Sequence, residues 1–231
     1  FFAYGILAFP IGLGVWLLVP EKKVRKTPDK LKQYWKKLKD VFHEKGRLLL
    51  SCYLVGMVAL FLLFGVLSYV SDILESTYNI FGLTKGFVLA IPVFSMALTS
   101  YLSGLFLSDR QPFWKPVIVG GMTVNAITMA LLPLFANLIP FMTVLFFAGI
   151  SIGILLPPIN SLITGATTSD RRGTITCLYG TVRFFGVAIG PPTFGLAIEL
   201  GQWLMFLGCA AIAAITAIIA LLSITPPRHS E

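Results

Sequence analysis

Arg183 is the residue whose type and position are hardest to explain by packing alone. It lies about eight residues into an apolar stretch, 175–198, and an ionised side chain is costly in hydrocarbon. Such an arginine either extends toward the nearer membrane surface or faces a central cavity, where it meets an anionic cargo group or a carboxylate. The chain offers few partners at that depth, because Asp72, Glu75 and Glu199 lie at the far ends of their stretches.

Two asparagines and one acidic pair are further candidates. Asn125 and Asn160 lie inside apolar stretches, where an amide lines a cavity or forms hydrogen bonds across helices. Asp72 and Glu75 are three residues apart in a polar turn, where they relay protons or form a solvated loop pair.

Motifs of enzymes and metal sites are absent from the sequence. It has no G-x-x-x-x-G-K-[ST] phosphate loop and no Ser/His/Asp cluster. Its cysteines and histidines lack metal or disulfide spacing. These are Cys52, Cys177, Cys209, His43 and His229. We therefore expect no enzyme activity, no cofactor and no metal.

Glycine and proline cluster in the same stretch as Arg183. Gly186 and Gly190 are four residues apart, so they share one helix face and let a neighbouring helix approach closely. Pro191 and Pro192 lack a backbone N–H and bend the helix. The pattern predicts a bent helix that rocks against its neighbour, or ordinary glycine packing in a bundle.

The composition places these residues in a membrane. Of the 231 residues, 56% are hydrophobic and only 12% are charged, whereas soluble domains are about 45–50% apolar and about 25% charged. The net charge of +8 does not indicate a nucleic-acid partner, because eleven of the 18 Lys and Arg residues lie in one loop, between Lys22 and Arg47. Such a loop is typical of the cytoplasmic side of an anionic membrane.

Seven apolar stretches are long enough to cross a bilayer. Residues 1–20 form the first, and 21–47 form a basic linker whose apolar residues recur at helical spacing from Pro28 to Gly46. This spacing predicts an amphipathic helix that lies on the inner leaflet or serves as a plain connector. The remaining spans are 48–70, 86–107, 117–136, 141–164, 175–198 and 203–224, before a tail at 225–231.

Alternating topology separates the charges. Sixteen Lys and Arg residues fall on the side of the linker, only Lys85 falls on the other, and Arg183 is in the membrane. The positive-inside rule therefore places the linker and the C-terminus in the cytoplasm.

Specific motifs resemble the major facilitator superfamily of transporters. The family often has proline in its tenth helix, then Arg-Gly at the inner turn and a glycine-rich eleventh helix. The matching residues are Pro157-Pro158, Arg172-Gly173 and Gly186-x-x-x-Gly190-Pro191-x-x-x-Gly195. Leu107-Ser108-Asp109-Arg110 matches the end of the family's G-x-L-x-D-R motif, although Gly104 stands one residue early. The resemblance covers the whole chain, as helix six to helix twelve, and is closest to the drug:proton antiporter branch.

The resemblance implies an all-α polytopic membrane protein. Residues 48–224 would form the C-terminal six-helix bundle, and 1–20 would be the last helix of an N-terminal half that precedes Phe1. Asp109 and Arg110 would clamp neighbouring helices, or form only a solvated loop pair. Gating would also involve Arg172, Gly173, Gly186, Gly190, Pro191 and Gly195.

The implied function is secondary active transport by alternating access, with proton-coupled efflux of small amphipathic or drug-like compounds from a bacterial plasma membrane. Two alternatives stay open. One is export of a specific anionic cargo, such as a metallophore or a lipid, with Arg183 as its anchor, and the other is a non-transporting membrane scaffold. The expected partners are the lipid bilayer, the N-terminal half, a small-molecule substrate and protons, and no nucleic acid.

Overall fold

The computed structural model describes residues 6, 8–10, 12–14, 17, 31–107, 110–167 and 169–224. The chain divides into two compact units, Phe1–Lys39 and Asp40–Glu231. Throughout the described residues the regular structure is helical, which confirms the predicted all-α class. Most of the predicted first span and of the linker before Leu31 lies outside the described residues.

Helix α2 (Leu31–Ser76) consists of two helical segments joined at a kink. The kink is at Lys45 (φ −123°, ψ 18°), one residue before the predicted stop at Gly46. The second segment continues past position 70, where we predicted a polar turn, because polar side chains near a membrane surface are solvated without ending the helix. The chain turns only at Asn79, which has a φ of 52°.

The other helices follow the predicted spans with shifted ends. They are α3 (Gly82–Leu107), α4 (Trp114–Leu131), α5 (Leu138–Gly165), α6 (Ser169–Ala197) and α7 (Gln202–Ser223), with short 3-10 turns η1 (Gln111–Phe113), η2 (Leu132–Leu134) and η3 (Ile198–Leu200). Among the described residues, six helical segments are long and apolar enough to cross a membrane. The protein is therefore an integral membrane protein, as its composition predicted.

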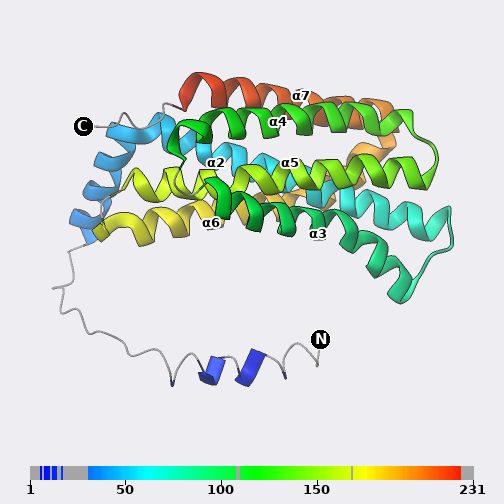
Figure 1. Cartoon of the computed structure of the whole chain (residues 1–231), viewed down its shortest axis with the longest axis horizontal. Helices are drawn as coiled ribbons and strands as arrows, with labels where there is room; N and C mark the ends of the chain where they lie inside the picture. Colours follow the sequence, from blue (N-terminus) through cyan, green and yellow to red (C-terminus); the bar gives the residue numbers. More distant parts are fainter. Residues whose placement is uncertain are drawn as a thin grey trace. The chain divides into compact units, whose positions relative to one another are not determined.

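Successive helices of the second unit run in opposite directions (Figure 1). The part of α2 just after its kink and the starts of α4 and α6 therefore share one end of the bundle with the ends of α3, α5 and α7, on the left in Figure 1. We call this the inner end, because Arg47, Arg110, Lys115, Arg171 and Arg172 belong to it. The turn between α2 and α3 marks the outer end.

The core of the bundle lies around α5. Helix α5 packs extensively against α3 and α4, and α4 packs extensively against α7. Near the outer end the rings of Tyr69, Phe141 and Phe206 join α2, α5 and α7, with centroids 5.3–6.4 Å apart. By contrast, α3 and α6 each have only 17% of their most apolar 18 residues buried, whereas the corresponding stretch of α2 is 72% buried. Helices α3 and α6 therefore present apolar faces that the described residues leave uncovered.

A ladder of hydroxyl groups joins α3 to α5. Three α3 hydroxyl groups, each four residues from the next, lie within hydrogen-bonding distance of α5 carbonyl oxygens that are also four residues apart. The pairs are Ser95 to Phe146 (3.0 Å), Thr99 to Ile150 (3.4 Å) and Ser103 to Ile154 (2.7 Å). Ser103 donates its proton to α5, whereas Ser95 and Thr99 also have closer acceptors in α3, the carbonyl oxygens of Pro92 (2.8 Å) and Ser95 (2.7 Å). This regular spacing is possible because both helices repeat about every 3.6 residues and run alongside each other.

Glycine and proline on α5 explain why the ladder forms there. A Cβ atom on Gly149 or Gly153 would collide with α3, so only glycine lets the two backbones come this close. Pro158 has no N–H with which to donate to the carbonyl group of Ile154. In a membrane such a group needs another donor, and the Ser103 hydroxyl supplies it.

We expect Ser103→Ala to destabilise the full-length protein by about 1 kcal/mol, because the Ile154 carbonyl group then lacks a donor. Denaturant unfolding in detergent micelles measures this change. Ser100→Ala is the matched control, since Ser100 lies on α3 and its hydroxyl forms no hydrogen bond with the described residues. Equal effects of the two substitutions would contradict the assigned role of Ser103.

Candidate transport site and helix seams

Arg183 lies at the midpoint of α6, fourteen residues from Ser169 and fourteen from Ala197. The helix begins six residues before the predicted span, so Arg183 is farther from the inner end than the sequence suggested. At 1.5 Å per residue, each end of the helix is about 21 Å away. The basic residues that mark the inner end, Arg171 and Arg172, lie twelve and eleven residues before Arg183.

The surroundings of Arg183 are aromatic. Its guanidinium carbon lies 5.5 Å from the ring centroid of Tyr179 and 5.4 Å from that of Phe184, within the range of cation–π attraction. Its Nε atom is buried and has no hydrogen-bond partner among the described residues, and the same is true of the Tyr179 hydroxyl. Two unpaired polar atoms therefore lie one helical turn apart, where lipid supplies no partner.

Helices α2 and α6 meet at a glycine seam, which we call the α2–α6 seam. A Cβ atom on Gly186 would collide with the carbonyl oxygen of Met57, and one on Gly190 would come within 2.8 Å of the carbonyl oxygen of Phe61. The predicted shared face of Gly186 and Gly190 therefore packs directly on the backbone of α2.

The α2 side of this seam also carries glycine, opposite aromatic rings of α6. A Cβ atom on Gly56 would come within 2.6 Å of the Tyr179 hydroxyl, and one on Gly65 would collide with the ring of Phe194. The Tyr53 hydroxyl donates to the carbonyl oxygen of Ile175 at 2.7 Å and adds a polar contact toward the inner end.

The remaining residues of the α6 motif lie beyond the closest contacts. Pro191 and Pro192 are inside the helix and cannot donate to the carbonyl groups four residues before them. Gly195 is exposed, and a Cβ atom there would meet nothing within 4 Å. Within the motif, Gly186 and Gly190 therefore form the close contact.

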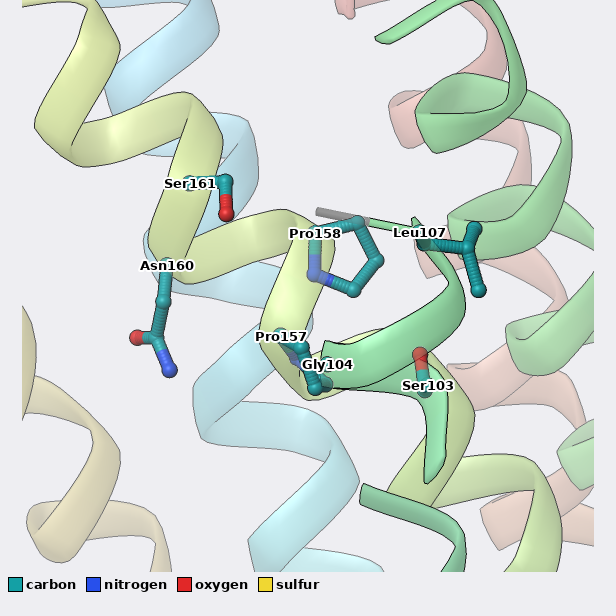
Figure 2. A pocket seen from close by; sticks show the side chains of 7 residues that line it. All are labelled: Ser103, Gly104, Leu107, Pro157, Pro158, Asn160 and Ser161. Atoms are coloured by element: carbon teal, nitrogen blue, oxygen red, sulfur yellow. The ribbon is translucent and has the colours of Figure 1, made fainter. Parts of the chain in front are cut away.

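Asn125 and Asn160 lie in different parts of the bundle. Asn125 is fully buried between α4 and α5, where its Nδ2 atom lies 3.4 Å from the Ser151 hydroxyl and its Oδ1 atom has no partner among the described residues. Asn160 is exposed at the rim of a cavity of about 280 Å³ between α3 and α5 (Figure 2). The other lining residues are Ser103, Gly104, Leu107, Pro157, Pro158 and Ser161.

The predicted gating residues at the inner turns are only partly described. Asp109 lies outside the described residues, and Arg110, Arg172 and Gly173 are exposed. In the same turn the backbone N–H of Arg110 donates to the carbonyl oxygen of Leu107 at 3.1 Å, and the Nε1–H of Trp114 donates to the same oxygen at 2.7 Å. The clamping role of the Asp109–Arg110 pair stays a prediction.

The acidic pair lies at the outer end, in two different settings. Glu75 forms an ion pair with Lys85, which lies in the first turn of α3. The distance between Glu75 Oε1 and Lys85 Nζ is 2.6 Å. Asp72 is exposed. A proton relay through these carboxylates stays a prediction, and for Glu75 it would compete with this ion pair.

Sequence reasoning missed the hydroxyl ladder and Tyr179. Ser95, Thr99 and Ser103 recur every four residues, which is a visible signal for one polar face on an apolar helix. Tyr179 precedes Arg183 by four residues, so a shared face was equally predictable. The residues that these side chains contact were not predictable, because such contacts depend on which helices lie side by side.

Comparison with known proteins agrees with this arrangement. Residues 1–191 and residues 78–231 both match the Major Facilitator Superfamily, and together the matches cover the chain. The chain belongs to this family of transporters. Over 201 residues it is 34% identical to the bacillibactin exporter of Bacillus subtilis (strain 168), which covers 86% of this chain. The chain spans about half the length of that curated relative.

We expect Gly186→Ala to destabilise the full-length protein by about 1–3 kcal/mol, because the new methyl group collides with the backbone of α2. Gly180→Ala is the matched control on α6, since a Cβ atom there meets nothing within 4 Å. The control should leave stability unchanged or raise it slightly, since alanine favours a helix. Thermal unfolding in detergent distinguishes the two, and a shift of the same sign and size would contradict the close contact.

Proposed function

We propose that the protein is a secondary active exporter that works by alternating access, and that this chain supplies the bundle that moves against an N-terminal half. The observation that carries the proposal is the similarity to an exporter over 86% of the chain. The glycine seam between α2 and α6 supports it, because glycine lets the two helices pack closely, and contacts between aromatic rings beside the glycines tolerate small shifts.

For the cargo we favour one specific compound over a broad range of drugs. The relative is named for a single compound, bacillibactin, and we propose bacillibactin or a closely similar molecule as the cargo here. Arg183 supports an anionic group on that cargo, since the Nε atom is buried and unpaired among the described residues. A carboxylate from the N-terminal half of the transporter is the other group that would pair with the charge of Arg183.

Proton-coupled efflux of drug-like compounds is the second candidate. It is favoured by the Gly186-x-x-x-Gly190-Pro191 pattern, which resembles the antiporter motif and packs against α2. The described acidic residues lie near helix ends, with Asp72, Glu75 and Glu199 toward the outer end and Asp40, Glu44 and Asp170 before or at the inner turns. The coupling carboxylates of this mechanism would therefore lie in the N-terminal half. We place the protein in a bacterial plasma membrane, with the linker and the C-terminus in the cytoplasm.

The test is efflux from proteoliposomes that contain the full-length protein under a pH gradient. We expect transport of bacillibactin, and a rise in KM of at least tenfold in Arg183→Ala, because about 1.4 kcal/mol of binding free energy corresponds to tenfold. Arg183→Lys should keep part of the affinity, since it retains the charge but not the planar donor group. Lys115→Ala, at the inner end of α4, is the control.

Each result separates the alternatives. Efflux of a cationic dye that dissipates the pH gradient, without bacillibactin transport, would favour drug efflux and reject export of a specific cargo. An unchanged KM in Arg183→Ala would remove Arg183 from cargo recognition. Failure to move either compound would reject both candidates.

A further inference from the structure

The contact between α3 and α5, which we call the α3–α5 seam, is tight over two turns and open at its inner end. A Cβ atom on Gly149 or Gly153 would collide with the α3 backbone. Further along the seam, a Cβ atom on Gly104 of α3 would meet no heavy atom within 4 Å. The close packing therefore stops beside Pro157.

The cavity of about 280 Å³ occupies this open end (Figure 2). Pro157 and Pro158 of α5 form one wall, and Ser103, Gly104 and Leu107 of α3 lie opposite them. The α3 residues belong to the last turns before its inner end at Leu107, and the α5 residues belong to the last turns before Gly165. A molecule that arrives from the cytoplasm would therefore reach this cavity before the midpoint of the membrane.

The cavity wall is mainly apolar, with a few polar groups, and carries no charge. None of its seven lining residues is ionisable. The Ser103 hydroxyl already donates to Ile154, so it offers only acceptor lone pairs, while the Ser161 hydroxyl forms no hydrogen bond with described residues. The Asn160 side chain points away from the other lining residues (Figure 2). Leu107 and the two proline rings supply apolar surface. This combination suits an uncharged ring or amide and disfavours an ion, whose desolvation nothing here would offset.

We propose that this cavity is a cargo subsite that takes an uncharged, hydroxyl- or amide-bearing arm of the exported compound. The inference rests on the proposed export function and divides recognition between two places. Arg183, at the midpoint of α6, holds the anionic group, and the α3–α5 cavity holds a neutral arm. The volume is just below the roughly 300–1,000 Å³ of pockets that enclose a whole small molecule, so it fits one arm of a larger cargo.

Filling the cavity from either wall tests the subsite. In proteoliposomes with the full-length protein, Gly104→Leu and Ser161→Leu should each raise the KM for bacillibactin at least fivefold and change kcat less than twofold. Gly120→Leu is the matched control, because a Cβ atom on Gly120 of α4 also meets nothing within 4 Å. An unchanged KM in both cavity variants would overturn the proposal.

A labelling experiment tests the cavity without transport. In the full-length protein with its exposed cysteines, including Cys177, replaced by serine, Ser161→Cys places a thiol in the wall. Benzamide at millimolar concentration should slow the reaction of this thiol with N-ethylmaleimide at least threefold, and benzoate should not. Adding Gly104→Leu should abolish the protection.

The two experiments separate failure of the subsite from failure of the exporter assignment. Protection by benzamide without bacillibactin efflux would keep the cavity as a binding site for neutral rings and reject the proposed cargo. Efflux without protection, or equal protection by benzoate, would reject the subsite and leave the exporter assignment intact.

Discussion

The bundle depends on how it satisfies backbone groups that proline leaves without a donor. Five prolines lie beyond the first turn of its described helices: Pro92, Pro157, Pro158, Pro191 and Pro192. In lipid each freed carbonyl group needs a donor from inside the protein. Ser103 provides one for Ile154, and it can do so because glycines on α5 bring α3 within reach. The prolines of α5 and the close approach of α3 to α5 therefore belong together. Both occur where α3, whose apolar face is largely uncovered, packs against the bundle.

Both seams bring two helices close together at glycine, but different contacts hold them. The α3–α5 seam combines glycine with hydroxyl groups that lie within hydrogen-bonding distance of α5 carbonyl oxygens, most closely Ser103 to Ile154. The α2–α6 seam combines glycine with aromatic rings, such as the Tyr53–Tyr179 pair at 5.6 Å and the Phe61–Phe194 pair at 6.0 Å. Hydrogen bonds specify one register, whereas ring contacts tolerate small shifts. The helix that carries Arg183 is thus held mainly by the more adaptable kind of contact.

Much of the site could be predicted from single helices. Arg183 was recognised because a charge in an apolar stretch is costly, and Gly186 and Gly190 because a spacing of four places them on one face. Asn160 was expected at a cavity and lies at the rim of one, but the open end of the seam was not predictable, since it depends on Gly104 and Pro157, which lie on different helices. The midpoint location of Arg183 was missed because polar residues near Ser169 hid the true start of α6.

The sequence by itself determined that the protein is a helical membrane protein of the major facilitator superfamily and which end of the bundle carries the basic residues. These properties belong to each segment alone, because the bilayer selects every span by its length, apolarity and flanking charge. Only the tertiary structure decided that Ser103 meets Ile154 and that Tyr179 faces Gly56. Those contacts join residues far apart in the chain. They depend on how each helix is rotated about its axis, and an apolar composition does not determine that rotation.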